Sequence, residues 1–372
     1  MRFLHTADWH IGKQLHGYSL AAEQADAFNQ IEQLALYHHV DAVVVAGDIY
    51  DRGIASEKSV QLGNQMFARL NREDHLPLLV ISGNHDSAPR LATGAPWYAD
   101  QGFVLRTTLD ECLTPVTLGD TQFFLLPFFG LQAARNFLDQ PVRTMDEAVG
   151  QLVMRMQDNF NSAMRHVLVA HLFAGGSMRT ESETPLEVGG LGPVSLSRLE
   201  CFDYVALGHL HTHTALQHSR IKYSGTPLKF SVSEVHDQKG CWLVDTTAGT
   251  QEFLPLTPLH DVIVLRDKFT TLVGPAHPHL DPNTFVAVQL TDKGIIPDAM
   301  NQLRQFYPRI IEMTRVNGVT SASREIKGVK RMAPLDVLTA YYEDVAGEPL
   351  STLQQEIATE ILGKVEAMHD AP

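Results

Sequence analysis

Cysteine is scarce in this sequence, and no two cysteines lie close together. Cys112, Cys201 and Cys241 are far apart and form no CxxC pair. A disulfide framework and a thiolate zinc site both require closely spaced cysteines, so neither is expected to organise the fold. The same cysteine usage predicts a reducing, cytoplasmic location.

Long apolar runs are also missing. No segment approaches the roughly 18 apolar residues that a membrane span needs. The N-terminal residues, MRFLHTAD, become polar too early for a secretory signal. We therefore expect no membrane segment. The sequence also contains no internal repeat, no low-complexity tract and no P-loop, so any ATP-driven step would need ATP bound by another chain.

An excess of basic residues is absent as well. The 372 residues include 29 Lys and Arg against 43 Asp and Glu, which gives a net charge of −14. This balance disfavours a passive nucleic-acid coat, because such a protein binds by neutralising phosphates with basic side chains. It does not exclude a nuclease, because bound divalent metals add positive charge where the phosphate lies.

Apolar β-rich runs alternate with helical periodicity over the first 260 residues. Strands are expected at 2–6, 42–46, 78–82, 122–128, 166–170 and 204–207. Helices are expected at about 20–38, at about 56–71 and from Thr144, where Thr144 and Glu147 form a capping box. This alternation is typical of an α/β sandwich. Short β runs without a helix at 205–256 predict a second, antiparallel sheet.

The sequence changes character after a proline-containing segment at 254–260. A strand, a helix and a strand are expected at 285–290, 297–306 and 310–316, which together indicate a small α+β unit. Two amphipathic helices are expected at 334–345 and 350–368, separated by a Gly-Glu-Pro break. We therefore divide the chain into domains 1–260, 261–332 and 333–372.

Asp, Asn and His residues cluster where the predicted strands end. The clusters are Asp8 with His10, Asp48 with Asp51, Asn84 with His85 and Asp86, His171, and His209 with His211. Ligands of open α/β sheets bind beyond the carboxyl ends of the strands, so all five clusters should line one crevice. Glycines directly before Asp48, Asn84 and His209 suit sharp turns at these positions.

The donor types indicate the chemistry. Carboxylate, amide and imidazole donors without a thiolate suit manganese, iron or zinc in an open site. Seven donors are too many for one catalytic metal, but they suit two ions roughly 3.5–4 Å apart that share a carboxylate and clamp a phosphoryl group. The seven are Asp8, His10, Asp48, Asn84, His171, His209 and His211. Each cluster alone has a structural explanation, such as an Asx turn, but together they predict a two-metal phosphodiesterase.

These motifs resemble the successive motifs of the calcineurin-like metallophosphoesterases. The flanking residues, such as HTADWHIG at 5–12 and YSGTPL at 223–228, narrow the resemblance to the SbcD nuclease subunits of bacterial SbcCD DNA-repair complexes. The resemblance covers the whole chain, with Ala7 and Thr226 in place of the usual serines. It implies an α/β fold: a four-layer α-β-β-α sandwich, then a small α+β capping domain and a C-terminal helix-loop-helix.

The resemblance also implies a role for each site residue. One metal, most naturally Mn²⁺, would be held by Asp8, His10, Asp48 and His211. A second would be held by Asp48, Asn84, His171 and His209. His85 would face the scissile phosphate and stabilise or protonate the leaving oxygen, and Asp86 would orient its ring. Asp51 would support the site or contact substrate, and Arg90 would meet a phosphate oxygen or form a surface salt bridge. His5 and Trp9 are expected in the core, and His213 is not expected to be a ligand.

The implied partners are DNA and an SbcC-type ATPase subunit, with this chain as a homodimer inside a nucleoid-associated heterotetramer. The basic run at 323–331 is a solvated linker or part of a DNA-binding face. Apolar rows on the terminal helices, such as Leu353 and Ile357, either pack on each other or grip the ATPase. The predicted activity is an ATP-regulated double-strand exonuclease and hairpin or single-strand endonuclease for repair and recombination. A small-molecule phosphodiesterase or phosphatase, and a metal-free scaffold, remain as alternatives.

Overall fold

The computed structural model describes residues 1–178, 192–294, 296–316, 333–346 and 349–369. The chain divides into two compact units, Met1–Val262 and Ile263–Pro372, which are considered separately here. The predicted DNA-binding run at 323–331 lies outside the described residues. The three cysteines are free thiols.

The first unit contains two main sheets. The six-stranded sheet has the order β13-β12-β1-β4-β5-β6, and the five-stranded sheet has the order β11-β10-β9-β8-β7. The strands of the first are β1 (Arg2–Thr6), β4 (Ala42–Ala46), β5 (Leu78–Ile81), β6 (Phe103–Arg106), β12 (Gly240–Asp245) and β13 (Thr250–Pro255). Those of the second are β7 (Val116–Leu118), β8 (Thr121–Leu126), β9 (Arg165–His171), β10 (Tyr204–Gly208) and β11 (Ile221–Tyr223). A short hairpin is formed by β2 (Gln14–Leu15) and β3 (Tyr18–Ser19).

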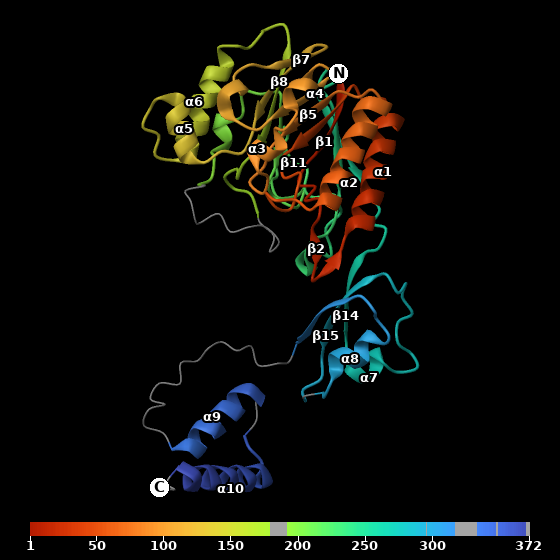
Figure 1. Cartoon of the computed structure of the whole chain (residues 1–372), viewed down its shortest axis with the longest axis vertical. Helices are drawn as coiled ribbons and strands as arrows, with labels where there is room; N and C mark the ends of the chain where they lie inside the picture. The colour runs from red at the N-terminus through yellow and green to blue at the C-terminus, as the bar shows by residue number, and fades with distance from the viewer. Residues whose placement is uncertain (179–191, 295, 317–332, 347–348, 370–372) are drawn as a thin grey trace. The chain divides into compact units, whose positions relative to one another are not determined.

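Helices cover the outer faces of the two sheets, as Figure 1 shows. On one side lie α1 (Ala21–Tyr37) and α2 (Glu57–Ala68), which continues as the π-helical turn η1 (Arg69–Glu73). On the other side lie α5 (Leu131–Leu138) and α6 (Met145–Gln157). Two short helices, α3 (Ala88–Leu91) and α4 (Ala95–Ala99), lie between β5 and β6 in the chain. Thr144 caps α6 by accepting a hydrogen bond from the Glu147 backbone N–H at 3.1 Å, as the sequence predicts.

The two sheets pack face to face around one apolar layer. Phe3 of β1 packs edge-on against Phe123 of β8 and Tyr204 of β10, with ring centroids 5.3 and 5.8 Å apart. These rings belong to a cluster that includes fully buried residues from both sheets, such as Val44 and Val167. Burying side chains of this size is the main favourable contribution to folding. It fixes the sheets against each other, and with them the loops at their carboxyl ends.

The expectation of a separate antiparallel sheet at 205–256 is wrong. Strands β10 and β11 extend the second sheet in parallel with β9. The hairpin of β12 and β13 instead joins the first sheet, where β12 pairs antiparallel with β1. The prediction failed because periodicity gives the type of an element but not the strand with which it pairs.

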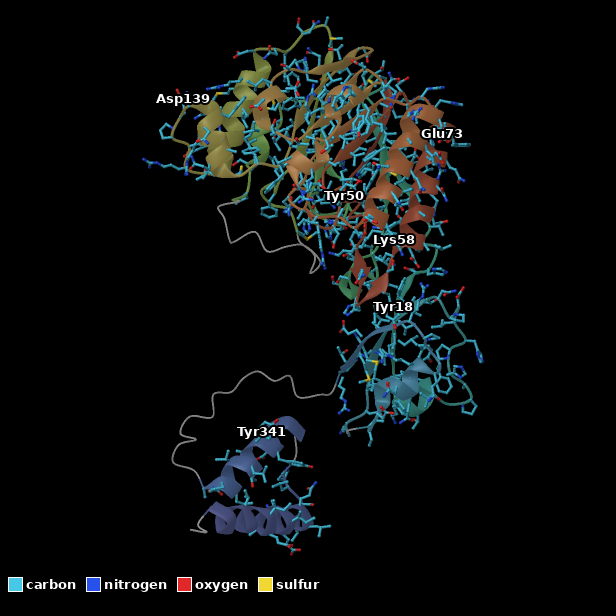
Figure 2. The ribbon with its side chains drawn as sticks, viewed as in Figure 1. Tyr18, Tyr50, Lys58, Glu73, Asp139 and Tyr341 are labelled. Atoms are coloured by element: carbon cyan, nitrogen blue, oxygen red, sulfur yellow. The ribbon has the colours of Figure 1, made fainter. Side chains whose placement is uncertain are left out.

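Parallel pairing places the carboxyl ends of β1, β4 and β5 together, and those of β8, β9 and β10 together. Figure 2 shows Tyr50, which follows β4, on the same side of the first unit as Lys58 in the first turn of α2. Glu73 lies toward the far end of that helix. The strand-end loops therefore share one end of the sandwich.

The second unit has a three-stranded sheet in the order β14-β15-β16, with β15 and β16 parallel. Its elements are β14 (Val262–Asp267), α7 (Phe269–Leu272), β15 (Phe285–Leu290), α8 (Ala299–Arg304) and β16 (Ile310–Arg315). Val286, Val288 and Leu303 lie in its buried core. Two further helices, α9 (Pro334–Ala346) and α10 (Thr352–His369), contact each other through a hydrogen bond from Gln354 to the Tyr342 hydroxyl at 2.9 Å. None of the described helices is both long enough and apolar enough to span a membrane.

Candidate metal centre

The predicted site residues follow the carboxyl ends of strands in both sheets. Asp8 follows β1, Asp48 follows β4 and Asn84 follows β5, all in the first sheet. His171 ends β9 and His209 follows β10, in the second sheet. The crevice therefore lies where the carboxyl ends of two packed sheets meet, rather than at the edge of one sheet.

Four of these positions have left-handed backbone conformations. The φ angles are 52° at Asp8, 42° at His10, 52° at Asp48 and 101° at His209. Such conformations cost on the order of 1–3 kcal/mol each in residues other than glycine, and they occur most often at functional sites. The packed sheets on either side supply the energy that holds the loops in these conformations.

Two glycines allow the strand ends to approach each other closely. A Cβ on Gly83 would overlap the carboxylate of Asp48, and a Cβ on Gly208 would overlap the backbone carbonyl of Ala46. The sequence argument assigned these glycines to sharp turns, but their backbones do not require a positive φ. Their role is to leave room between neighbouring loops.

Asp48 lies between two groups of potential ligands. Its Oδ2 is 3.4 Å from His171 Nε2 and 3.6 Å from His10 Nε2. Its Oδ1 accepts a hydrogen bond from the His85 backbone N–H at 2.8 Å. The carboxylate is 2% exposed. A buried carboxylate in contact with imidazoles on both sides is suited to bridge two cations.

Asn84 brings together the two histidines of the second sheet. Its Oδ1 lies 2.9 Å from His171 Nε2 and 3.0 Å from His209 Nδ1. His171 donates through Nδ1 to the Ala46 carbonyl at 2.9 Å, because a carbonyl oxygen can only accept. This fixes the tautomer that presents Nε2 to the crevice, as is usual for a metal-binding histidine.

Asp8 fixes the loop that carries His209. Both of its carboxylate oxygens accept hydrogen bonds from the His209 backbone N–H, at 2.9 and 3.0 Å. Asp8 Oδ1 is also 3.9 Å from His171 Nδ1. One ligand atom each from Asp8, Asp48 and His171 lies within 4.8 Å of the others, which is close enough to hold one ion.

His10 is the most unusual histidine of the site. It is fully buried, and neither ring nitrogen has a hydrogen-bond partner among the described residues. Burial lowers its pKa to about 4, although the charge of Asp48 opposes that shift. A neutral buried imidazole with two unsatisfied nitrogens is costly unless a further group completes the site.

The electrostatics of His171 and Asp48 are coupled. Burial alone would lower the pKa of His171, but the charges of Asp48 and Asp8 outweigh it and raise the pKa to about 9. Burial opposes ionisation of Asp48, yet the neighbouring histidines hold its pKa well below the usual range. The carboxylates therefore stay ionised and attract positive charge to this buried position.

The oxygen and nitrogen donors of this site fit a pair of divalent cations, because they include two carboxylates, an amide oxygen and imidazoles without any thiolate. The unsatisfied nitrogens of His10 support the same conclusion independently. His211 lies beside His10, with ring centroids 5.2 Å apart, and is 3% exposed. The structure thus brings the seven predicted donors into one connected cluster.

Comparison with known proteins agrees with this geometry. Residues 1–213 match the model of the calcineurin-like phosphoesterase family, and residues 258–346 match a model described as the type 5 capsule protein repressor C-terminal domain. The SbcD subunit of the SbcCD nuclease of Staphylococcus epidermidis is 31% identical over 96% of this chain and 96% of its own length. The chain belongs to the SbcD family of nuclease subunits. It is therefore a nuclease of the calcineurin-like phosphoesterase class.

Two other proteins show the extent of the likeness. The SbcD subunit of the SbcCD nuclease of Staphylococcus saprophyticus is 30% identical over 97% of this chain and 98% of its own. The solved structure of TT1561 from Thermus thermophilus is 14% identical, covering 68% of this chain and 98% of its own, with a TM-score of 0.41.

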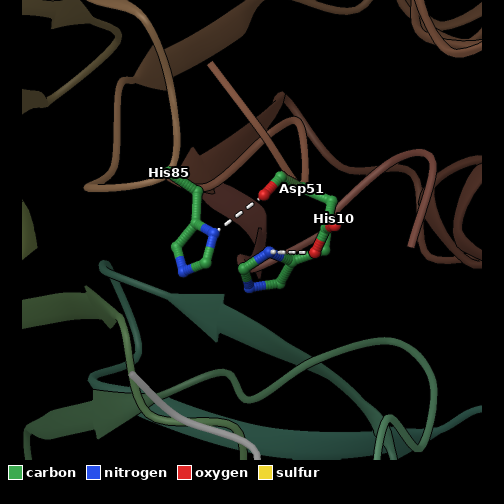
Figure 3. A group of neighbouring side chains, drawn as sticks. All are labelled: His10, Asp51 and His85. Atoms are coloured by element: carbon green, nitrogen blue, oxygen red, sulfur yellow. Dashed lines mark hydrogen bonds and ion pairs between the residues drawn. The ribbon is translucent and has the colours of Figure 1, made fainter. Parts of the chain in front are cut away.

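One positioning role in this SbcD family member differs from the prediction. Asp86 was expected to orient the ring of His85, but His85 Nδ1 lies 2.8 Å from the backbone carbonyl of Asp51 (Figure 3). Asp86 instead accepts hydrogen bonds from the backbone N–H groups of Ile49, Tyr50 and Gly83, at 3.1, 3.0 and 2.9 Å. Burial and the nearby Asp48 raise the pKa of Asp86 to about 6. Its carboxylate ties the second and third strand-end loops together.

Asp51 lies against His10 rather than in open solvent. Its Oδ1 is 3.8 Å from His10 Nδ1 and 2.9 Å from the ammonium of Lys13. Figure 3 shows the Asp51 carboxylate facing one ring and its carbonyl facing the other. Sequence reasoning missed Lys13, and only its place three residues after His10 could have indicated it.

The other assignments divide clearly. Arg90 is exposed at the end of α3, where it lines a cavity of 490 Å³ together with Tyr50 and Arg52. Trp9 is buried, with Phe28 and Phe67 packed against it at 4.8 and 5.4 Å, as expected. His5 is also buried, as expected. His213 stacks on Phe253 with ring centroids 3.7 Å apart.

Proposed function

We propose that this chain hydrolyses phosphodiester bonds of DNA at a two-metal centre, with Asp48 as the bridging ligand. The observation that carries the proposal is the fully buried His10, whose unpaired nitrogens face Asp48 and Asp51. No group among the described residues completes this site, whereas a divalent cation would. One ion would be held by Asp8, His10, Asp48 and His211, and the other by Asp48, Asn84, His171 and His209.

Two such ions supply a nucleophile from water at neutral pH and neutralise the charge of the phosphoryl oxygens. The protein holds its own groups ready for the rest of the reaction. The carbonyl of Asp51 can only accept, so His85 Nδ1 carries a hydrogen and Nε2 is left to exchange a proton. His85 would give that proton to the leaving oxygen of the DNA strand.

We assign manganese as the ion of both positions, since nitrogen and carboxylate donors in an open site suit it. Iron and zinc accept similar donors, so the metal has to be identified by measurement. Metal analysis of the protein purified without chelator, followed by reconstitution with Mn²⁺, Fe²⁺ or Zn²⁺, should return the highest turnover with Mn²⁺. Highest turnover with another ion would overturn this assignment and leave the two-metal site intact.

The assignment of DNA as substrate rests on the relatives. Both curated relatives are named as nucleases, and they align along 96% and 98% of their own lengths. A second unit follows the phosphoesterase unit and matches a separate family model. We propose that residues 261–332 cap the DNA, since a small substrate would not need such a unit.

The relatives' name also places them in a two-subunit nuclease. By analogy, this chain would act in the cytoplasm as a homodimer bound to an SbcC-type ATPase, whose ATP hydrolysis would regulate cleavage. Residues 333–372 are the candidate contact with that ATPase. Exposed apolar side chains repeat along α10 at Leu353, Ile357 and Ile361, on the turns that a partner helix would cover.

The deciding experiment is a nuclease assay on end-labelled hairpin DNA with Mn²⁺, with and without the ATPase subunit and ATP. We expect hairpin opening and double-strand degradation that require Mn²⁺ and increase when both ATP and the ATPase subunit are present. Hydrolysis of bis-p-nitrophenyl phosphate without DNA cleavage in the complete mixture would instead assign a small-molecule phosphodiesterase.

A further inference from the structure

A buried carboxylate lies behind the predicted ligand His211. Glu234 ends a short 3₁₀ helix (Val232–Glu234) and has no exposed surface. Its Oε2 pairs with the ammonium of Lys239 at 2.5 Å and lies 3.4 Å from the Phe230 backbone N–H. Its Oε1 accepts no hydrogen bond from any described residue. An ionised carboxylate is rarely buried with one oxygen unsatisfied unless that oxygen has a task.

The unsatisfied oxygen faces the ring of His211. Glu234 Oε1 lies 4.0 Å from His211 Nδ1, and the His211 side chain is 4% exposed. Lys239 connects the two residues, because its ammonium also donates to the His211 backbone carbonyl at 2.9 Å. The Thr226 backbone N–H donates to the same carbonyl at 3.1 Å. The main chain of His211 is thereby pinned, and the ring is left next to a buried negative charge.

The other histidines of the site follow the same plan. His171 donates through Nδ1 to the Ala46 carbonyl, and His85 through Nδ1 to the Asp51 carbonyl. His10 Nδ1 lies 3.8 Å from the Asp51 carboxylate. In each case an oxygen stands behind the ring nitrogen that the reaction does not use. An acceptor of this kind fixes the tautomer of a metal-binding histidine and makes its other nitrogen a stronger ligand.

We propose that Glu234 is a positioning residue for the metal centre, which acts by accepting the Nδ1 hydrogen of His211 and so presents Nε2 to one of the two ions. Lys239 keeps the carboxylate ionised and in place. When the ion draws on Nε2, the 4.0 Å gap closes to the roughly 2.9 Å of a hydrogen bond. This inference rests on the proposed two-metal function, and it adds two residues that lie more than twenty positions beyond the last predicted ligand.

The test removes the carboxylate and its counter-charge together. Glu234→Leu combined with Lys239→Met leaves no unpaired buried charge, so the variant should fold. The matched control is Glu23→Leu with His260→Leu, which removes another buried carboxylate pair, with Oε1 and Nδ1 2.8 Å apart. Mn²⁺ binding is followed by the electron paramagnetic resonance of the free ion, and the melting temperature is measured without metal.

We expect the Glu234 and Lys239 variant to bind one of its two ions about 10- to 100-fold more weakly. The control should bind both ions within about twofold of wild type, with a similar fall in melting temperature. Glu234→Asp, which keeps the charge but withdraws it by one methylene, should weaken the same ion to an intermediate degree. This single variant also provides the measurement if the double variant does not fold.

A double-mutant cycle identifies the route of the effect. In a His211→Ala background, removal of Glu234 and Lys239 should cause no further loss of Mn²⁺ affinity, since the residue through which they act is gone. A second, additive loss would overturn the proposal, as would wild-type affinity for both ions in the double variant. Wild-type protein that binds fewer than two ions would overturn the proposed function itself, so the two failures are distinguishable.

Discussion

At the scale of single residues, His85 is distinguished from the predicted ligands by its setting. It is half-buried and held through Nδ1 by a main-chain carbonyl, while His10 beside it is fully buried, with ring centroids 4.7 Å apart. A backbone carbonyl fixes the direction of the ring without holding a counter-charge against it. This suits proton exchange with a substrate better than metal binding.

We predict that His85→Leu binds two Mn²⁺ ions but loses turnover by at least about 100-fold, because general acid catalysis typically contributes 10²–10⁴-fold. Metal content and cleavage of hairpin DNA are measured on the same preparation. His38→Leu, at the end of α1, is the control and should leave both unchanged. Turnover near the wild-type rate in the His85 variant would remove it from the mechanism.

His5 gives a residue-scale prediction outside the metal centre. It is fully buried between the Tyr204 hydroxyl and the Leu207 carbonyl, at 3.0 and 3.2 Å. Burial lowers its pKa from 6.5 to about 3, against the opposing effect of the Leu207 hydrogen bond. Below pH 6.5 the unfolded chain therefore takes up a proton that the folded protein refuses. The stability due to neutral His5 is present above pH 6.5 and is lost as the pH falls toward 3.

We expect the free energy of unfolding of wild type to fall by about 2 kcal/mol more than that of His5→Gln between pH 7 and pH 5. Urea denaturation of chelator-treated protein at the two pH values measures the difference, because all other titrating groups are common to both proteins. Equal losses in the two proteins would show that His5 does not titrate in this range.

At the scale of elements, the metal centre depends on loops that pack against each other at the ends of strands. Gly83 lies against the Asp48 carboxylate, so any side chain at this position would push the loop of Asn84 away from β4. We predict that Gly83→Ala reduces bound Mn²⁺ below two ions per chain and lowers stability by about 1–3 kcal/mol.

Gly130→Ala is the matched control for this prediction. Gly130 precedes α5 with a φ of −85°, and no atom lies within 4 Å of an added Cβ. Elemental analysis of both variants after dialysis against Mn²⁺ gives the comparison. Two tightly bound ions in Gly83→Ala would mean that the loops tolerate displacement and that their close packing does not determine the site.

The elements also show what the sequence can and cannot predict. Strands such as Arg2–Thr6 and Ala42–Ala46 occur within the predicted bounds, because short buried β-branched runs between polar turns have one good solution. The partners of β10 to β13 were predicted wrongly, since pairing depends on contacts distant in sequence. The same limit applies to the site. His10 and Asp48 follow predicted strands, whereas Glu234 lies in an irregular segment without a pattern.

At the scale of the whole molecule, division of labour between units is the remaining question. The phosphoesterase unit holds all predicted donors, while α9 and α10 belong to the second unit. Gln354 joins the two helices, and Ala358 of α10 is buried while Leu353 is 65% exposed. Exposed apolar side chains spaced four residues apart favour a partner helix over water.

We predict that Leu353→Ser, Ile357→Ser and Ile361→Ser together abolish co-purification with the ATPase subunit, because they remove most of the apolar area that a partner helix would bury. Mn²⁺-dependent hydrolysis of bis-p-nitrophenyl phosphate should be unchanged, since no predicted donor is touched. Gln355→Ser with Thr359→Ser alters exposed polar positions of the same helix and should leave the complex intact. A triple variant that still brings down the ATPase would place the contact elsewhere, and deletion of residues 333–372 would then decide whether any part of these helices is needed.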